Sequence, residues 1–517
     1  MTVVIINQSE VTVIRRGFAL RSTRLSILLA IAVILSACDS PESAWEEARE
    51  KDTVAAYEKF VTKYPESPNH DAALQRIDWL NKTVIHRAAR DGDLELVPSM
   101  LASGTDVNYS EAWGGAPLHA AASGCQLAVT ELLLAKGAAV SARDANDATP
   151  LHYAARAGCL DTVNLLLERG ADLEVQVRVG LQGFVVQETE VLAFGQQQPG
   201  TKGTALHWAA AVGKADVVER LIAKGAIVDT INDWGESPLH LAAVSDDLPT
   251  VNILLAHGAV AQYGNEPDER YPTKSGQPLH YAQSVPVVEA LVAHGATIDV
   301  PSPNTGMPIH IAASRGNKAL VEYYLSKGIN ADAQSTWNVG SGWSYPVTPA
   351  WTAAKYGYLD IVKLLEAHDA DLTFKTEEYG GRAGLLHVAA VGGNPELVTY
   401  LLDKGLPIEG RAEVSTEQTM FEPLYDMTPL AVAAYFGRRD AIDVLLARGA
   451  DIGVTVNREW GIFEMSLKSG DPELVRYLLE QGAPIDVTAD EFQQWRASDE
   501  IKSTVTDFLR TRGTPAQ

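Results

Sequence analysis

Residues 149–155 read Thr-Pro-Leu-His-Tyr-Ala-Ala, and residues 165–172 read Leu-Leu-Leu-Glu-Arg-Gly-Ala-Asp. The first segment can start a helix, because a threonine hydroxyl caps free backbone amides and a proline fits the first helical position. Its paired alanines let a neighbouring helix approach closely, and the leucines of the second segment form an apolar stripe. Gly170 can end the second helix in the left-handed conformation. The two segments therefore predict a pair of packed helices.

The same frame recurs along the chain. Its first positions are Thr83, Ala116, Thr149, Thr204, Ser237, Gln277, Met307, Thr348, Gly384, Thr428 and Gly461. Four of the ten spacings equal 33 residues (83 to 116, 116 to 149, 204 to 237 and 428 to 461), and the pattern resembles the ankyrin repeat, whose period is about 33 residues. One such repeat cannot bury its own apolar face. The resemblance therefore implies an all-α solenoid of about eleven stacked repeats over residues 83–486, with β-turn fingers between the repeats.

The segments that flank the repeats have other patterns. Residues 38–82 carry apolar side chains at three- and four-residue spacing with a proline break, and they resemble a short tetratricopeptide-like helical hairpin. The alternative is a simple helical cap over the first repeat. The frame at Gly461 lacks the Pro-Leu-His sequence, so we expect it to close the array, followed by a C-terminal capping helix and tail in residues 487–517.

One repeat is shorter than the others. The step from Gln277 to Met307 is 307 − 277 = 30 residues, three fewer than the period. The missing residues fall near Ser284-Val285-Pro286, where the inner helix should turn. We therefore predict a local irregularity at this point of the array.

Residues 1–37 have the pattern of a secretory signal. Four arginines precede residues 25–37, which are nearly all apolar and too few to span a bilayer. Leu35-Ser36-Ala37-Cys38 resembles the lipobox of bacterial lipoproteins, which implies cleavage before Cys38 and acylation of its thiol. In families with this lipobox, Asp39 favours retention in the inner membrane. The resemblance implies a lipid-anchored envelope protein that faces the periplasm; an ordinary signal with an incidental cysteine is the alternative.

The charge balance narrows the class of partner. The chain has 42 Lys and Arg against 66 Asp and Glu, which gives a net charge of −24. A nucleic-acid binder needs a basic surface, so this class is excluded. The acidic excess favours protein partners with a basic surface.

The histidines belong to the repeat frame. Eight of the twelve occupy its fourth position: His86, His119, His152, His207, His240, His280, His310 and His387. In ankyrin repeats this ring is a structural hydrogen-bonding partner of the capping residue and the neighbouring backbone. The remaining histidines show no His-Glu-x-x-His or Cys-x-x-Cys spacing, and no phosphate loop or nucleophile elbow is present. We therefore predict no catalytic residue, metal ligand, cofactor or small-molecule substrate, and a protein that is not an enzyme.

Two cysteines remain after Cys38. Cys125 and Cys159 fall at frame positions ten and eleven of consecutive repeats, at the turn between the two helices. Stacked helices lie about 8–10 Å apart, slightly too far for a disulfide between equivalent residues unless the turn relaxes. A disulfide and two buried thiols both remain open.

The insertions between repeats are the predicted partner-binding segments. The step from Thr149 to Thr204 exceeds 33 residues by 22, which places a finger insertion at residues 176–203, and further long connections span 261–276, 334–347, 374–383 and 411–427. Aromatic residues on such loops commonly anchor interfaces, although these rings could instead shield the helix ends beneath them. The predicted anchors are Phe184, Phe194, Tyr263, Tyr271, Trp337, Trp343, Tyr345, Phe374, Tyr379, Phe421 and Tyr425.

Taken together, these features predict a non-catalytic, periplasm-facing lipoprotein. The resemblance to ankyrin proteins implies that it binds protein partners through its fingers and concave face, as a scaffold or adaptor. Two alternatives stay open: an immunity or inhibitor protein against a secreted toxin, and an oxidative-stress accessory of a periplasmic enzyme.

Overall fold

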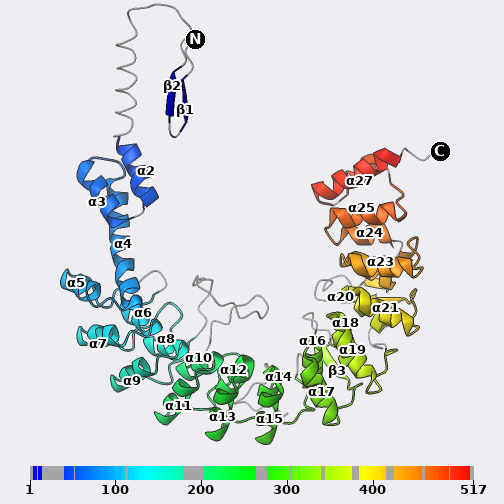
Figure 1. The fold of residues 1–517 in the computed structure, drawn as a ribbon, viewed down its shortest axis with the longest axis horizontal. Helices are drawn as coiled ribbons and strands as arrows, with labels where there is room; N and C mark the ends of the chain where they lie inside the picture. Colours follow the sequence, from blue (N-terminus) through cyan, green and yellow to red (C-terminus); the bar gives the residue numbers. More distant parts are fainter. Residues whose placement is uncertain are drawn as a thin grey trace, which may run out of the picture. The chain divides into compact units, whose positions relative to one another are not determined.

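The computed structural model describes residues 4–7, 10–13, 40–51, 53–110, 114–177, 203–262, 276–302, 306–338, 344–374, 383–414, 424–456, 460–487, 489–495 and 497–512 (Figure 1). The chain is mostly helical, as predicted, and the described strands form two-stranded antiparallel sheets. It divides into two compact units, residues 1–144 and residues 145–517.

The first unit begins with a strand pair and continues as helices. Val4 pairs with Val13 in its β1–β2 sheet. Its elements are β1 (Val4–Asn7), β2 (Glu10–Val13), α2 (Pro41–Lys51), α3 (Val54–Lys63), α4 (His70–Asp91), α5 (Leu96–Ala102), α6 (Pro117–Ser123) and α7 (Leu127–Ala135).

Helices α2, α3 and α4 pack around a small aromatic core of their own. Tyr57 and Phe60 are buried together with Ala48 and Ala73, and the ring of Trp45 lies against both aromatic rings. The predicted helical hairpin is therefore present. Its last helix differs from the prediction, because α4 runs without a break through Thr83 and ends at Gly92 with a φ of 80°. Thr83 lies inside a helix instead of starting one, so the hairpin and the first repeat share α4.

The second unit is a stack of helix pairs. Its inner helices are α8 (Pro150–Ala157), α10 (Ala205–Ala211), α12 (Pro238–Ser245), α14 (Pro278–Tyr281), α16 (Pro308–Ser314), α18 (Pro349–Lys355), α20 (Leu385–Gly392), α22 (Pro429–Tyr435) and α24 (Ile462–Leu467). Its outer helices are α9 (Leu160–Glu168), α11 (Ala215–Ala223), α13 (Leu248–Ala256), α15 (Val285–Ala293), α17 (Lys318–Ser326), α19 (Leu359–Glu366), α21 (Pro395–Asp403), α23 (Arg439–Ala447) and α25 (Pro472–Glu480).

Each inner helix contacts the next inner helix from α8 to α24, and each pairs with its own outer helix (Figure 1). The alanines of the frame are fully buried at this contact, for example Ala154 and Ala155. The leucine of the third frame position, such as Leu151, is buried beside them. Close approach of small residues and burial of the leucine stripe thus form one continuous core along the unit.

Side chains in the loops after the outer helices connect neighbouring repeats. Asp229 Oδ1 accepts a hydrogen bond from the backbone amide of Val260 at 3.0 Å, and Glu409 Oε1 accepts one from the amide of Asp451 at 2.7 Å. Glu174 with Ile227, Gln262 with Thr297 and Asp332 with Asp371 repeat the arrangement. These bonds satisfy loop amides that have no partner in a sheet or helix.

The predicted irregularity is present at α14, which has four residues where its neighbours have seven or eight. Side chains from both adjacent repeats bond to the shortened turn. Asp246 accepts from Ser284 Oγ at 2.8 Å, and Asn317 Nδ2 donates to the Gln283 carbonyl at 2.6 Å. Arg315 extends its guanidinium toward the carbonyls of His280 and Tyr281. The missing helical turn is thus replaced by side-chain hydrogen bonds.

The fingers and the C-terminal end complete the unit. Among the described residues, three hairpins precede inner helices: β3 (Ser335–Asn338) with β4 (Ser344–Val347), β5 (Ala412–Val414) with β6 (Leu424–Met427), and β7 (Thr455–Val456) with β8 (Trp460–Gly461). After α25 the chain forms α26 (Ala489–Phe492) and α27 (Asp499–Arg512), two helices where one had been predicted. Phe492 and Trp495 pack on Phe463 of the last repeat.

Candidate functional site

Most of the frame histidines fix the backbone from which the fingers project. Nε2 of His310 lies 3.0 Å from the carbonyl oxygen of Val347, the last residue of β4. His387 bonds in the same way to Gly410, just before β5. His152 and His240 reach the carbonyls of Gly203 and Gly276, which follow the first two insertions, and His207 and His280 reach Glu236 and Val300. Each of these bonds ties an inner helix to the connection that follows its repeat.

The protonation state of these rings follows from their partners. A carbonyl oxygen only accepts, so Nε2 carries the proton and Nδ1 is the acceptor. Nδ1 of His240 accepts from the backbone amide of Ser237 at 3.0 Å and lies 2.9 Å from its hydroxyl. Burial lowers the pKa of His240 to about 3 and the pKa values of His207 and His310 to about 4. These rings are therefore neutral structural groups at physiological pH.

The threonines were predicted to cap free backbone amides. Where a histidine occupies the fourth frame position, the threonine hydroxyl bonds to the histidine ring instead. Thr149 directs its hydroxyl to Nδ1 of His152, 2.9 Å away. In two of the frames that begin with threonine, the histidine is replaced by Trp351 and by Ala431. There the threonine hydroxyl accepts directly from the backbone amide of that residue at 3.3 Å. The threonine oxygen caps the helix itself only where no ring competes for it.

Two neighbouring fingers are joined by one guanidinium. Arg411 Nη1 lies 2.6 Å from Asp426 Oδ2 and donates to the carbonyl of Thr455 at 2.9 Å, so it bridges the β5–β6 hairpin and β7. Strands β6 and β7 are also in contact. Two aromatic side chains are exposed on this pair of hairpins: Tyr425 is 42% exposed and Trp460 is 37% exposed. Lys468 Nζ lies 5.3 Å from the centre of the Trp460 ring. We call Arg411, Tyr425, Asp426 and Trp460 the paired-finger surface.

The structure describes only part of the predicted set of anchors. Tyr425 is exposed on β6, and Phe374 is half-buried in the turn after α19. The backbones of Trp337 and Tyr345 are opposite each other in the β3–β4 pair. The other predicted anchors lie outside the described residues: Phe184, Phe194, Tyr263, Tyr271, Trp343, Tyr379 and Phe421. The first finger is described at its base, where Val177 and Gly203 form an antiparallel bridge.

Three exposed aromatic residues were missed by the sequence reasoning. Trp460 lies in a connection of ordinary length, so a search for long insertions passes over it. Tyr356 and Tyr358 are exposed at the turn between α18 and α19, and their rings contact each other. The available signal in the sequence was a pair of tyrosines on either side of Gly357, a glycine at the turn between two helices.

The predicted cysteine pair lies within the described residues, and the predicted lipidation site lies outside them. Cys125 has a φ of 56° in the first unit, and Cys159 is the N-terminal cap of α9 in the second. Their disulfide stays a prediction. Cys38 lies outside the described residues. Within the part of the chain that is described, no helix is long and apolar enough to cross a bilayer. Nor do three His, Cys, Asp or Glu residues gather there as a metal site.

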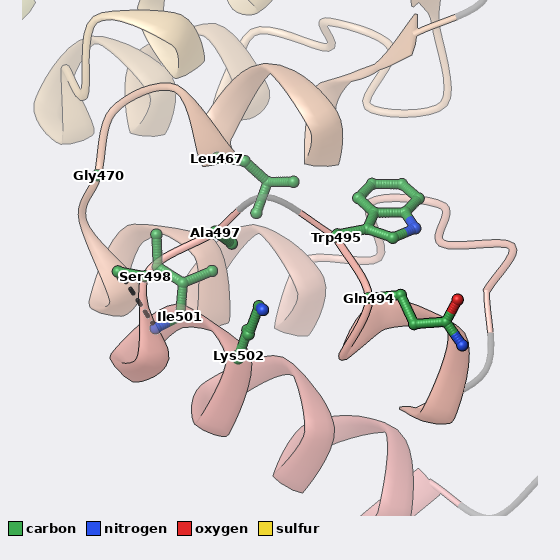
Figure 2. Close-up of a pocket in the computed structure, with 8 residues that line it drawn as sticks. All are labelled: Leu467, Gly470, Gln494, Trp495, Ala497, Ser498, Ile501 and Lys502. Carbon is green, nitrogen blue, oxygen red and sulfur yellow. Dashed lines mark hydrogen bonds between the residues drawn. The ribbon is translucent and has the colours of Figure 1, made fainter.

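An open pocket of about 670 Å³ lies at the C-terminal end of the stack (Figure 2). Its wall combines the last repeat with helix α27 and the segment between α26 and α27. The lining residues are Leu467, Gly470, Gln494, Trp495, Ala497, Ser498, Ile501 and Lys502. A smaller pocket in the first unit is lined by Trp45, Arg49, Tyr57, Ala72 and Arg76.

Comparison with known proteins establishes the class of protein. A family model of ankyrin repeats (three copies) matches residues 85–177, 186–265, 279–376, 309–412, 351–456 and 386–491. These matches cover more than half of the chain, so the chain belongs to the ankyrin-repeat family. This fold is typically a non-catalytic scaffold for protein–protein interaction, and that is the class of the repeat array described above.

Individual relatives match this chain over part of their own length. It is 26% identical over 320 residues to human transient receptor potential cation channel subfamily A member 1, covering 54% of this chain and 27% of the channel. It is 27% identical over 317 residues to the Caenorhabditis elegans ankyrin repeat and KH domain-containing protein mask-1, covering 54% of this chain and 11% of that protein. The chain thus spans well under a third of these relatives.

A third relative and a solved structure extend the comparison. The putative palmitoyltransferase ZDHHC13 of Danio rerio is 34% identical over 116 residues, which are 22% of this chain and 17% of that protein. The crystal structure of the human ASB11 ankyrin repeat domain is 27% identical, with a TM-score of 0.38, and covers 47% of this chain and 96% of that chain.

Proposed function

We propose that this chain is a periplasm-facing lipoprotein that binds a protein partner along its finger edge, with the paired-finger surface at the centre of the contact. The observation that carries the proposal is the pair of exposed rings, Tyr425 and Trp460, on two hairpins held together by Arg411. Aromatic residues on a fixed backbone lose little conformational entropy on binding, which makes them effective interface anchors. The net charge of −24 favours a partner with a basic surface.

The backbone beneath this surface supports the proposal. His387 holds the base of β5 through Gly410, and Gly461 N donates to Glu464 Oε2 at the end of β8. The hairpins therefore start and end at fixed points of the helical stack. The backbone of these hairpins is already ordered in the folded protein. Binding a partner there therefore loses little further conformational entropy.

The decisive experiment is a crosslinked recovery of partners from native membranes. The double variant Tyr425→Ser/Trp460→Ser should lose the specific partner, whereas the control Val292→Ser removes an exposed apolar side chain from outer helix α15 and should retain it. Retention of the same partner by the double variant would contradict the paired-finger surface. The identity of the partner distinguishes a scaffold from an immunity protein or an oxidative-stress accessory.

The first finger is tested separately. Val177 and Gly203 exchange backbone hydrogen bonds of 3.1 and 3.4 Å across the base of this insertion. Replacing residues 178–202 by Asn-Gly closes a two-residue hairpin at that pair and leaves the repeat frame intact. If partner recovery survives this change but fails in the Tyr425 and Trp460 double variant, the contact is centred on the later fingers.

The lipid anchor on Cys38 is supported by the sequence of residues 1–37 alone. With the anchor, the protein should fractionate with membranes and incorporate labelled palmitate, and the Cys38→Ala variant should do neither. Separating inner from outer membranes then tests the prediction from Asp39 that the protein is retained in the inner membrane. Recovery of the unaltered protein in the soluble fraction would contradict the anchor.

A further inference from the structure

The helical hairpin that precedes the repeats contains a pocket of its own. Helices α2, α3 and α4 surround this open space of about 380 Å³ (Figure 1 shows the three helices). Of the five described residues that line it, two are arginines and none is acidic: Trp45 and Arg49 of α2, Tyr57 of α3, and Ala72 and Arg76 of α4. Two like charges at one pocket repel each other, so this lining favours an anionic occupant. We call it the hairpin pocket.

The aromatic core of the hairpin holds one side of this pocket in place. The ring centre of Trp45 lies 5.8 Å from that of Tyr57 and 5.4 Å from that of Phe60. Tyr57 and Phe60 are buried, and Trp45 is half-buried against them. On the side of α4, Ala72 ends at its Cβ atom and leaves room for a ligand. The pocket therefore exists before any ligand binds, which keeps the entropy cost of binding low.

Arg49 carries an ion pair that a stronger anion can displace. Its Nη1 lies 3.1 Å from Glu46 Oε1 and 3.4 Å from Oε2. The two side chains are 57% and 68% exposed, so the pair contributes little to stability. Both contacts use the same guanidinium nitrogen, whereas a phosphate group can take two donors of the fork at once. A phosphate therefore has an advantage over the carboxylate of Glu46 at this guanidinium.

The position of the hairpin in the chain indicates where the phosphate comes from. Helix α2 begins at Pro41, and 41 − 38 = 3 residues separate it from Cys38. Three residues reach at most about 11 Å, so an acylated Cys38 would hold the start of α2 beside the lipid headgroups. Trp45 lies one turn further along α2, and tryptophan rings are favoured at this level of a membrane. This step rests on the lipid anchor of the proposed function.

We propose that the hairpin pocket binds the phosphate of a phospholipid headgroup, with Arg49 and Arg76 as its hydrogen-bond donors. Residues 41–76 carry eight acidic and five basic side chains, so no general attraction to anionic lipid is expected from this segment. The pocket supplies a specific contact instead. Together with the anchor it gives the hairpin two points of attachment, which fix its orientation on the membrane. A single acylated residue would leave the hairpin free to rotate.

Native mass spectrometry of the full chain, as purified from cells in dodecyl maltoside, tests the proposal in a detergent that contains no phosphate. The probe is dioleoyl-phosphatidylglycerol, and the comparison probes are dioleoylglycerol and inorganic phosphate. We expect one phosphatidylglycerol per chain to be retained, and dioleoylglycerol to be retained roughly tenfold more weakly. Equal retention of dioleoylglycerol would overturn the proposal. Displacement of the lipid by inorganic phosphate at equal concentration would identify a free anion as the occupant and would also overturn it.

Variants with matched charge separate the pocket from general electrostatics. Arg49→Lys keeps the charge but removes the fork, and it should weaken retention roughly tenfold. Because the Arg49 side chain is mostly exposed, this variant should fold. Glu46→Gln removes the competing carboxylate and should strengthen retention. The control Lys59→Gln removes an exposed charge from α3 outside the pocket and should leave retention unchanged. Unchanged retention in both Arg49→Lys and the double variant Arg49→Gln/Arg76→Gln would overturn the proposal.

The same spectra distinguish a failure of the pocket from a failure of the anchor. The intact mass of the chain shows whether Cys38 is acylated. An acylated chain that retains no phosphatidylglycerol overturns the hairpin pocket and leaves the anchor in place. A chain without acyl groups that still retains the lipid through Arg49 refutes the anchor and supports the pocket.

Discussion

His310 joins the inner helix of its repeat to the hairpin that follows, because its Nε2 donates to the carbonyl oxygen of Val347 at 3.0 Å. The ring is fully buried. His310→Ala should lower the free energy of unfolding by about 2–4 kcal/mol, since it leaves a cavity and a buried carbonyl without a donor. Amide hydrogen exchange in residues 344–347 should rise with it. The exposed His368→Ala should change stability by less than about 0.5 kcal/mol. Equal effects of the two variants would contradict a positioning role for His310.

The buried histidines make the protein sensitive to acid. Burial lowers the pKa of His240 to about 3 and the pKa values of His207 and His310 to about 4. The unfolded chain then binds more protons than the folded one below pH 6.5, so stability falls as pH decreases toward 4. Each such histidine should remove about 2 kcal/mol between pH 6.5 and 5.

Melting temperatures across this pH range measure the effect, and His240→Gln should make the dependence less steep because glutamine does not titrate. The carboxyls of Asp229 and Glu236 act in the opposite direction, because burial raises their pKa values. A folded group with a raised carboxyl pKa gains stability as pH falls. A melting temperature that is constant from pH 6.5 to 5 would be inconsistent with neutral buried rings.

Two glycines at frame position ten of their repeats separate the effect of backbone strain from that of contact with the next repeat. Gly357 and Gly470 have similar φ values, +79° and +74°, but only Gly357 is covered by a residue of the next repeat. Both Gly→Ala variants should lower the free energy of unfolding by about 1–2 kcal/mol, because alanine is strained in the left-handed conformation. Gly357→Ala should lose more, because its Cβ would lie 3.1 Å from Cβ of Asn394. Chemical denaturation compares the two, and equal losses would show that the contact is unimportant.

Arg315 compensates for the short inner helix α14. Its guanidinium is directed at the carbonyls of His280 and Tyr281, and burial lowers the pKa of the guanidinium without discharging it. Arg315→Ala should destabilise this repeat by about 1–2 kcal/mol, since helix-end carbonyls lose their donor. Hydrogen exchange in residues 278–284 should increase, whereas the exposed Arg156→Ala should leave it unchanged. No change in exchange there would contradict the compensation.

Cβ distances at equivalent positions of later repeats favour the disulfide that the sequence left open. Cys125 and Cys159 hold frame positions ten and eleven of consecutive repeats. At the same two positions further along, a Cβ on Gly213 would lie 2.8 Å from Cβ of Asp247, and one on Gly393 would lie 3.3 Å from Cβ of Arg438. A disulfide needs Cβ atoms about 3.5–4.5 Å apart, which a small relaxation of such a junction provides. Peptide mapping without reductant should recover the linked pair; two alkylated thiols in protein isolated from the envelope would refute it.

The helix pairs could be predicted because their cause is local. Thr149-Pro150 and Gly170 mark where helices begin and end, and the alanine and leucine positions repeat in phase with them. The same pattern misplaced the start of the first repeat. Thr83 resembles a cap, but the hairpin before it is itself helical, and a continuous α4 keeps the backbone hydrogen bonds that a cap would replace.

The binding surface was less predictable because exposure depends on neighbours. The length of a connection identified Tyr425 but passed over Trp460, which is exposed in a connection of ordinary length. The bond from Arg411 to the carbonyl of Thr455 spans 455 − 411 = 44 residues, and no frame position encodes it.

The short helix α14 also has a mechanical meaning. In a repeat array each unit is held mainly by its immediate neighbours, so the weakest junction determines where the array separates under load. We expect the weakest junction to lie at α14, because this helix has only four residues and side chains from adjacent repeats replace its missing turn. When the second unit is pulled from its ends, we expect α14 to open first as the force rises and to close last as the force falls.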